Sequence, residues 1–291
     1  MIKPGRSRYE KKALLVGIND YAPAGPGGPD LRGCVNDVQD MATTLAVLGI
    51  VPSSPATMRI LTDSRATRAA IISGLQWLVN GAETGDLLIF HYSGHGSQVI
   101  DVEGDEPDGK DETICPHDFA TSGMIKDDDL RAVFASVPAN VNLDVLLDSC
   151  HSGTGTRELS ALAASPEDQS VSYRYVEPPI DWGFFIDSNP SLPSRSILRK
   201  KATKDAVITP GVNHILWAGC RDNQTSAEAS VGGVYRGIFT FNFCKILRAA
   251  GVTITRKNLS IQICRNIKSM GYAQVPQLDG IASSLNEKVF S

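Results

Sequence analysis

The sequence has no surplus of positive charge, no long apolar run and no paired cysteines. Its 28 Lys and Arg residues are outnumbered by 32 Asp and Glu residues, so the formal net charge is −4. A general role in binding nucleic acid or a membrane surface therefore has no electrostatic support. No apolar run reaches the length of a membrane span, and the polar, basic N-terminus lacks the apolar segment of a secretion signal.

The six cysteines are scattered along the chain and form no C-x-x-C pair. In a chain of 291 residues this pattern indicates free thiols in a reducing compartment, not a disulfide framework. We therefore expect a cytoplasmic protein. We also expect it to be a monomer. Hydrophobic residues make up 42% of the chain and charged residues 21%, so a sizeable core can form and gross disorder is excluded.

Short apolar runs alternate with segments of helical periodicity. The expected strands are 13–18, 58–62, 87–92, 141–147 and 214–218. The expected helices are 36–48, 67–79 with Thr67 as N-cap, 127–136, 238–249 and 257–269. The run 87–92 is apolar almost throughout, which is typical of a parallel strand covered on both faces. The pattern predicts an α/β fold with a mostly parallel central sheet flanked by helices on both faces.

Two stretches interrupt this alternation. Residues 101–112 are acidic and contain Gly and Pro, so we expect a loop there. Residues 154–212 form a long irregular insertion, and a stretch of that length inside a compact domain is usually functional or mobile. Neither stretch resembles a linker between two cores. We therefore expect an N-terminal tail at 1–12 and one domain at 13–291.

Reactive side chains follow two of the expected strands. His95 stands in Ser-Gly-His-Gly after the strand 87–92, and Cys150 stands in Asp-Ser-Cys-His-Ser-Gly after the strand 141–147. Active sites of α/β sheets lie beyond the carboxyl ends of the strands, so these two residues are expected to meet. A thiol becomes a strong nucleophile when a nearby imidazole takes its proton. The backbone amides of Gly96 and Cys150 would be placed to stabilise an oxyanion.

Two other histidines compete with His95 for the role of base. His91 lies inside the strand 87–92, where packing is the more common role, and His151 is adjacent to Cys150 and is expected to point elsewhere. A cysteine at a strand end can also be a small buried hydrophobic residue with no function. The two motifs at neighbouring strand ends together favour a catalytic pair.

The chain resembles a type I metacaspase, a caspase-like cysteine peptidase of clan CD and family C14, without a prodomain. The resemblance is carried by the His95 and Cys150 motifs and by segments spread over nearly the whole chain. These segments are Leu31-Arg32-Gly33-Cys34-Val35-Asn36-Asp37, Asp127-Asp128-Asp129-Leu130, 218–226 and Tyr272-Ala273-Gln274-Val275-Pro276-Gln277-Leu278. The Q-A-C-x-G signature of true caspases is absent.

The resemblance implies a caspase-like fold and a peptidase that cleaves after Arg or Lys through a thioester acyl-enzyme. His95 would be the general base and acid, Cys150 the nucleophile, and the amides of Gly96 and Cys150 the oxyanion hole. The implied basic-residue pocket consists of Cys34, Asp37, Ser93 and Asp148. Buried carboxylates beside the nucleophile would bind a guanidinium and reject an acidic side chain.

The resemblance also implies that calcium can activate the protein, although the chemistry itself requires no cofactor. It places Asp111, Asp127 and Asp128 at the positions of the family's calcium ligands, and carboxylate oxygens suit that ion. The alternative is that the consecutive aspartates only form an acidic helix start. The acidic loop is not an EF-hand, because Glu106 occupies the position that requires Gly.

The basic tract in the insertion is a candidate for self-cleavage. The candidate sites are Arg199, Lys200, Lys201 and Lys204, and the alternative is a solvated basic loop. The expected partners are protein or peptide substrates with basic residues, with neither nucleic acid nor a membrane involved. Two other functions stay open: a catalytically silent signalling or binding module of the same fold, and a caspase-like peptidase of different primary specificity.

Overall fold

The computed structural model describes residues 9–22, 29–100, 110–150, 171–176, 214–221 and 224–291. Its centre is a six-stranded sheet in the order β12-β9-β7-β3-β1-β2. The five parallel strands are β1 (Lys11–Gly17), β2 (Met58–Thr62), β3 (Leu87–Ser93), β7 (Asn142–Asp148) and β9 (His214–Ala218). The edge strand β12 (Gln277–Asp279) runs antiparallel to β9. The expected α/β fold with a mostly parallel sheet is therefore confirmed.

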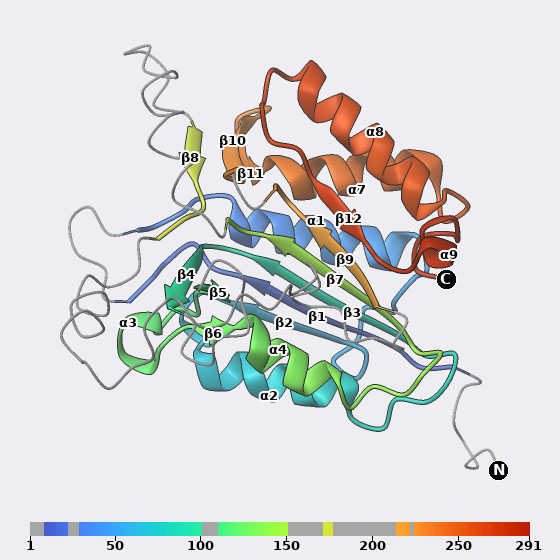
Figure 1. Cartoon of the computed structure of the whole chain (residues 1–291). Coiled ribbons are helices and arrows are strands. Elements are labelled where there is room, and N and C mark those ends of the chain that lie inside the picture. The colour runs from blue at the N-terminus through green and yellow to red at the C-terminus, as the bar shows by residue number, and fades with distance from the viewer. Residues whose placement is uncertain (1–8, 23–28, 101–109, 151–170, 177–213, 222–223) are drawn as a thin grey trace, which may run out of the picture.

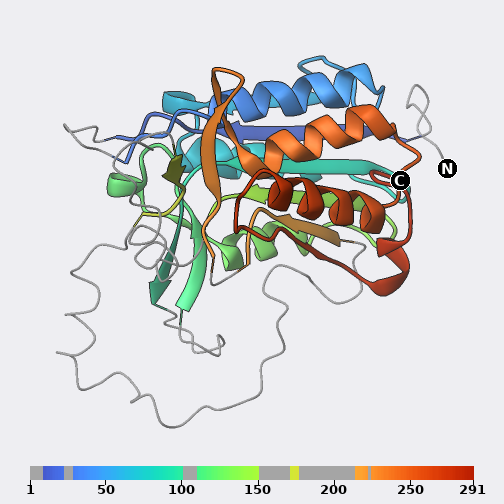
Figure 2. The same ribbon diagram turned by 90° about the horizontal axis from the view of Figure 1, so that it is seen from above.

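Helices cover both faces of this sheet, as Figures 1 and 2 show. One layer holds α1 (Cys34–Val47), α7 (Ile238–Ala250) and α8 (Arg256–Ser269), and the other holds α2 (Arg68–Val79) and α4 (Asp127–Phe134). Each layer packs its apolar side chains against one face of the sheet, so that two hydrophobic clusters are separated by the strands. Every residue of β3 is buried, which agrees with the apolar run of its sequence.

The predicted helix boundaries are close to the observed ones because the local signals are strong. The hydroxyl of Thr67 accepts a hydrogen bond from the Ala70 amide at 3.2 Å and caps α2 as predicted. Thr255 caps α8 in the same way, accepting from the Asn258 amide at 3.2 Å. The strands β2 and β9 have the predicted bounds, whereas β1 begins at Lys11, inside the segment expected to be a tail.

Two small antiparallel sheets stand beside the carboxyl ends of the parallel strands. One consists of β4 (Gly96–Ile100), β5 (Lys110–Ile114) and β6 (Ile125–Lys126), and the other of β8 (Val171–Tyr173), β10 (Ala227–Val231) and β11 (Val234–Gly237). Three short helical segments complete the described structure: η1 (Asp63–Arg65), α3 (Phe119–Ser122) and α9 (Ala282–Leu285).

The small sheets correct two expectations. Residues 110–112 of the expected acidic loop belong to β5, and the expected irregular insertion contains the strand β8. Both strands are short and form through pairing with distant partners, so no local periodicity reveals them. The rest of the acidic loop, 101–109, lies outside the described residues.

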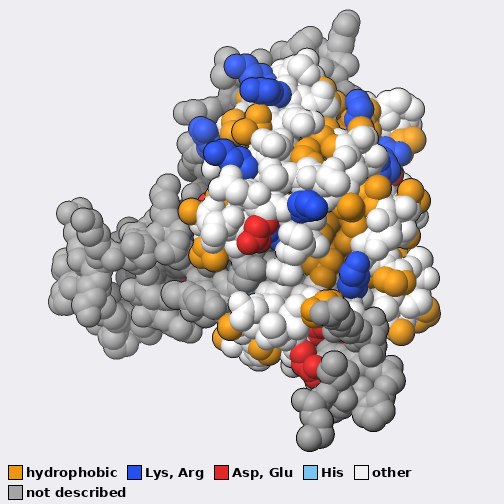
Figure 3. Space-filling model, turned by 90° about the vertical axis from the view of Figure 1, so that its right-hand side faces the viewer, with side chains coloured by type: hydrophobic (Ala, Val, Ile, Leu, Met, Phe, Trp, Pro, Cys, Tyr) orange, Lys and Arg blue, Asp and Glu red, His pale blue; other side chains and the backbone are white. Residues whose placement is uncertain are grey.

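Among the described residues, no helix is both long and apolar enough to cross a membrane. All six cysteines lie in the described structure as free thiols, as expected. Figure 3 shows the side of the molecule to the right of Figure 1, where basic side chains are dispersed and do not form one patch.

Candidate active site

The strands β3 and β7 place His95 and Cys150 at the same edge of the sheet. The two strands pair in parallel, and the last pair in their register is Ser93 with Asp148, so the segments that follow both strands start side by side. A β-carbon on Gly96 would collide with the carbonyl group of Cys150, which shows how closely the two segments approach. Cys150 is fully buried and His95 is 3% exposed.

The imidazole of His95 is oriented by backbone and aromatic contacts. Its Nε2 makes a short hydrogen bond with the carbonyl oxygen of Pro29, which assigns the ring proton to Nε2. The ring of Tyr21 lies 5.0 Å from the imidazole, centroid to centroid. Within the described structure Nδ1 has no hydrogen-bond partner. Burial lowers the pKa of His95 to about 4, so its Nδ1 is an available proton acceptor at neutral pH.

The thiol of Cys150 lies against the backbone of Ser226. The Ser226 amide donates to Sγ at 2.5 Å, and Sγ lies 3.3 Å from the Ser226 carbonyl oxygen. The backbone amides of Cys150 and Gly96 both donate to one oxygen, the carbonyl of Arg174, at 3.2 and 3.0 Å. Two amides from neighbouring strand ends that converge on one carbonyl oxygen have the geometry of an oxyanion hole.

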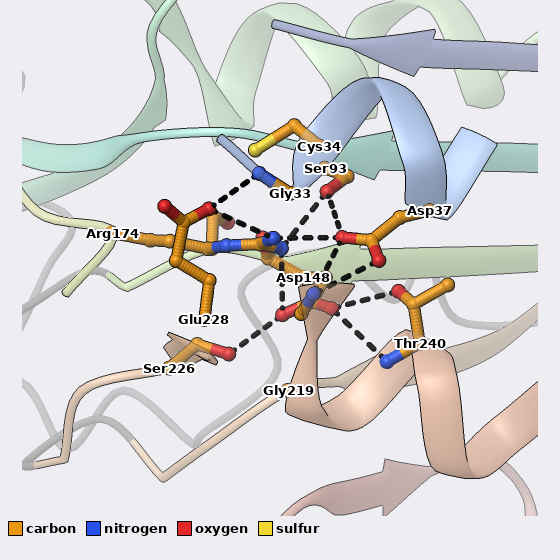
Figure 4. Close-up of polar contacts among 12 residues, drawn as sticks. Gly33, Cys34, Asp37, Ser93, Asp148, Arg174, Gly219, Ser226, Glu228 and Thr240 are labelled. Carbon is orange, nitrogen blue, oxygen red and sulfur yellow. Dashed lines mark hydrogen bonds and ion pairs between the residues drawn. The ribbon is translucent and has the colours of Figure 1, made fainter. Parts of the chain in front are cut away.

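The guanidinium of Arg174 is fully buried in an acidic pocket beside these amides (Figure 4). Its Nη2 lies 2.7 Å from Asp37 Oδ2 and 3.6 Å from Glu228 Oε2. Its Nη1 lies 3.1 Å from Asp148 Oδ1 and donates to Ser93 Oγ at 2.8 Å. Three buried carboxylates therefore surround one buried cation, an arrangement that stabilises a guanidinium.

Sequence comparison shows the family of this chain. Residues 11–157 match the description "Metacaspase, peptidase C14 domain". The chain belongs to the metacaspase family. It is 32% identical to Metacaspase-1 of Mycosarcoma maydis over 94% of this chain and 73% of that protein. It is 34% identical to Metacaspase-1 of Ajellomyces capsulatus over 92% of this chain and 79% of that protein. Metacaspases are cysteine-type endopeptidases, and so is this chain.

Structural comparison agrees with this assignment. A protein of Geobacter sulfurreducens, GSU0716, superposes with a TM-score of 0.68 at 27% identity, over 97% of this chain and 98% of that one. Caspase-1 of Spodoptera frugiperda superposes with a TM-score of 0.51 at 14% identity, over 98% of this chain and 92% of that one. The second similarity shows that the metacaspase has the caspase-like fold.

The four residues predicted to form the basic-residue pocket lie close together in the metacaspase. Ser93 donates to Asp37 Oδ2 at 2.8 Å while it accepts from Arg174, and the buried Cys34 opens α1 next to the guanidinium (Figure 4). Burial is the main influence that raises the pKa of Asp37, and the positive charge of Arg174 opposes it. Burial also opposes the charge of Arg174, but attraction to the carboxylates outweighs it and raises the pKa of Arg174 well above its usual value.

Sequence reasoning did not find several residues that complete this pocket. Glu228 on β10 contacts Arg174 and accepts from the amides of Arg32 and Gly33, both at 2.9 Å, which ties β10 to the start of α1. The only local signal for Glu228 is a charged residue between two alanines. Because Arg32 and Gly33 are 196 and 195 residues away in sequence, only the folded chain reveals its role.

Asp148 is held by hydrogen bonds from Thr240 in α7 and from Ser226, the residue directly before β10. Its Oδ2 accepts from the Thr240 amide at 3.0 Å and from the Thr240 hydroxyl at 2.7 Å, and its Oδ1 accepts from Ser226 Oγ at 2.6 Å. A β-carbon on Gly237 would lie within 3 Å of Asp37, Asp148 and Arg174, so the absence of a side chain there leaves room for the guanidinium.

The competing base His91 lies in the core, where its Nε2 is 3.2 Å from Thr240 Oγ1. Burial lowers the pKa of His91 to about 4, so the folded protein keeps this imidazole neutral at physiological pH. His151, the other competitor, lies outside the described residues, as do the predicted self-cleavage sites Arg199, Lys200, Lys201 and Lys204.

The neutral state of His91 predicts a pH-dependent contribution to stability. Between pH 6.5 and about 4 the unfolded chain binds a proton at this position and the folded chain does not, so stability falls as the pH falls through this window. Between pH 7 and pH 4 we expect the free energy of unfolding to fall in both proteins, and to fall by up to about 3 kcal/mol less in the His91→Gln variant than in the wild type. Urea unfolding at several pH values measures this difference. If the free energy of unfolding changed equally with pH in the two proteins, the role of His91 would be contradicted.

The predicted calcium ligands are each paired with a basic side chain. Lys126 Nζ lies 2.5 Å from Asp111 Oδ2, Arg131 Nη2 lies 3.2 Å from Asp127 Oδ2, and Arg131 Nη1 also pairs with Asp128. In the part of the chain that the structure describes, no group of three or more His, Cys, Asp or Glu side chains is arranged to hold a metal ion. These residues do not fit a calcium site in this arrangement, and calcium activation stays a prediction.

Proposed function

We propose that this metacaspase hydrolyses peptide bonds after Arg or Lys with Cys150 as nucleophile and His95 as general base and acid. The observation that carries the proposal is the Arg174 guanidinium, held by buried carboxylates directly beside the amides of Cys150 and Gly96. A pocket that holds this guanidinium can hold the same group of a substrate. Cys34, Asp37, Ser93, Asp148 and Glu228 are the proposed lining of the pocket.

The reaction begins with the transfer of the Cys150 proton to His95, because the neutral imidazole keeps a free lone pair on Nδ1. The thiolate attacks the substrate carbonyl, and the amides of Gly96 and Cys150 stabilise the resulting oxyanion. His95 then donates the proton to the leaving amine, which leaves a thioester on Cys150. Water, deprotonated by His95, hydrolyses the thioester and regenerates the thiol. None of these steps requires a cofactor.

The charge of the pocket favours basic residues before the cut. Asp37, Asp148 and Glu228 are all buried, so an acidic substrate side chain would meet uncompensated repulsion at low dielectric. Arg can bond to several carboxylate oxygens at once, whereas Lys presents a compact ammonium. We therefore expect Arg to be preferred over Lys. The acidic lining of the pocket argues against a caspase-like preference for Asp, and the free Nδ1 of His95 argues against a silent module.

Substrate profiling with fluorogenic peptides tests this function. We expect hydrolysis after Arg, slower hydrolysis after Lys, and none after Asp or Asn. The Cys150→Ala variant serves as the inactive control. A profile dominated by Asp or Asn would favour the alternative specificity, and no hydrolysis of any basic peptide would favour the silent module. Resemblance to type I metacaspases predicts faster cleavage with calcium, so equal rates with calcium and with a chelator would contradict that part.

The proposed partners, compartment and oligomeric state of the enzyme complete the proposal. Protein or peptide substrates with basic residues are its proposed partners, and the free thiols favour the cytoplasm. We propose that it works as a monomer.

A further inference from the structure

Residues 171–176 pass through the candidate active site as an extended segment. Its first part, β8, pairs antiparallel with β10: Tyr173 faces Ala227, Ser172 faces Glu228 and Val171 faces Ala229. An extended strand added to the edge of a sheet is a common way for a protein to bind a peptide. The segment therefore lies in the cleft as a bound peptide would.

The hydrogen bonds continue along the segment past the strand. The Arg174 amide donates to the Ser226 carbonyl at 3.2 Å, and the Arg174 carbonyl accepts from the amides of Gly96 and Cys150. Beyond Arg174, Tyr175 forms a parallel bridge with Gly96, and the Val176 amide donates to the Gly96 carbonyl at 3.0 Å. The backbone is thus held on both sides of the bond between Arg174 and Tyr175.

These contacts put each part of Arg174 where a substrate needs it. The guanidinium fills the acidic pocket, the carbonyl oxygen accepts from the two candidate oxyanion-hole amides, and the following residues lie along β4. We propose that residues 171–176 are an internal substrate that closes the cleft, and that the Arg174–Tyr175 peptide bond is a self-cleavage site. This inference rests on the proposed function and places the cut upstream of the basic tract 199–204.

The cut follows the same chemistry as peptide hydrolysis. Cys150 Sγ bonds to the Arg174 carbonyl carbon after its proton passes to His95, and the bond to the Tyr175 nitrogen breaks as His95 returns that proton to the nitrogen. Water then hydrolyses the thioester and leaves a carboxylate on Arg174 and a free amine on Tyr175. The reaction occurs within one molecule, so its rate constant does not depend on the protein concentration.

Occupancy of the cleft also limits access for other substrates. Arg174 and Cys150 are both fully buried, so another peptide can enter only after the segment withdraws. If the segment fills the cleft for nine-tenths of the time, it lowers the apparent activity about tenfold. Cleavage at Arg174 removes the covalent connection across the cleft and lets the two new ends leave.

Mass spectrometry of the purified chain over time tests the proposal. We expect a fragment that ends at Arg174 and one that begins with Tyr175, formed at a rate independent of concentration. Arg174→Ala should abolish this cut and raise the initial rate on an Arg peptide at least about tenfold over the uncut wild type. Arg174→Lys should retain the cut. As a matched control, Ala at Arg199, Lys200, Lys201 and Lys204 together should leave this cut unchanged.

A synthetic peptide of residues 171–176 separates a folding defect from a failed inference. The Arg174→Ala chain should cleave this peptide between its Arg and second Tyr, and leave an Arg-to-Ala version of the peptide intact. A wild type that cleaves Arg peptides but forms no fragment ending at Arg174, with Arg174→Ala no faster, would overturn the inference alone. If neither chain cleaves any basic peptide, the proposed function fails and the inference fails with it.

Discussion

Replacing Cys150 with Ala is expected to lower kcat/KM for Arg peptides by about three to six orders of magnitude. Ala keeps the backbone amide that donates to the Arg174 carbonyl but removes the sulfur that would form the acyl-enzyme. His95→Ala should cost nearly as much, because a thiol without its base is a weak nucleophile. The double variant should be hardly worse than either single one, since the two side chains act as one unit. Initial rates on an Arg fluorogenic peptide measure all three losses.

Cys244→Ala is the matched control for this experiment. Cys244 is also a fully buried free thiol, but it lies in α7 and packs into the hydrophobic cluster around α1 and α8. Its replacement should cost stability and leave the activity near that of the wild type. A Cys150→Ala variant that stays folded and retains more than about a tenth of the activity would refute the role of Cys150, because no dyad tolerates loss of its nucleophile.

The Asp148→Asn variant is expected to lose about 30-fold to several thousand-fold in kcat/KM on Arg peptides, and little on peptides with Gln before the cut. Asp148 lies 3.1 Å from the buried guanidinium, and a neutral amide of the same size removes the attraction at low dielectric. The ratio of the Arg rate to the Gln rate is the measurement. Because both peptides enter the same cleft, occupancy by residues 171–176 cancels in this ratio.

Asp144→Asn is the matched control for Asp148→Asn. Asp144 lies four residues earlier on the same strand, is equally buried, and pairs with Arg256 at 3.5 Å instead of lining the pocket. Loss of this ion pair should lower the free energy of unfolding but leave the Arg-to-Gln ratio unchanged. If both variants changed the ratio equally, the effect would come from general destabilisation and the role of Asp148 would be refuted.

Local patterns predicted the central layers well because they depend on few neighbouring residues. The apolar run of β3, the helical spacing of α1 and the Thr67 cap of α2 are each signals within one element. The short strands β8, β10 and β11 have no such signal, since each is stabilised by pairing with residues far away in sequence. The same reason explains why the insertion was expected to be irregular throughout.

The sequence by itself indicated the candidate catalytic residues and the order of the five parallel strands and the five long helices. His95 and Cys150 follow two buried strands, and the geometry of a parallel sheet requires that such strand ends share an edge. It also indicated Asp37 and Asp148 as acids near that edge, through a family resemblance that the whole chain supports.

Only the tertiary structure decided what fills the pocket. Arg174 stands in a segment without periodicity, and nothing beside it in sequence distinguishes it from the other basic residues of the insertion. Its role comes from Asp37, Glu228 and Ser226, which lie between 52 and 137 residues away and act through charge and backbone hydrogen bonds. Such contacts depend on position in space, which the chain acquires only when it folds.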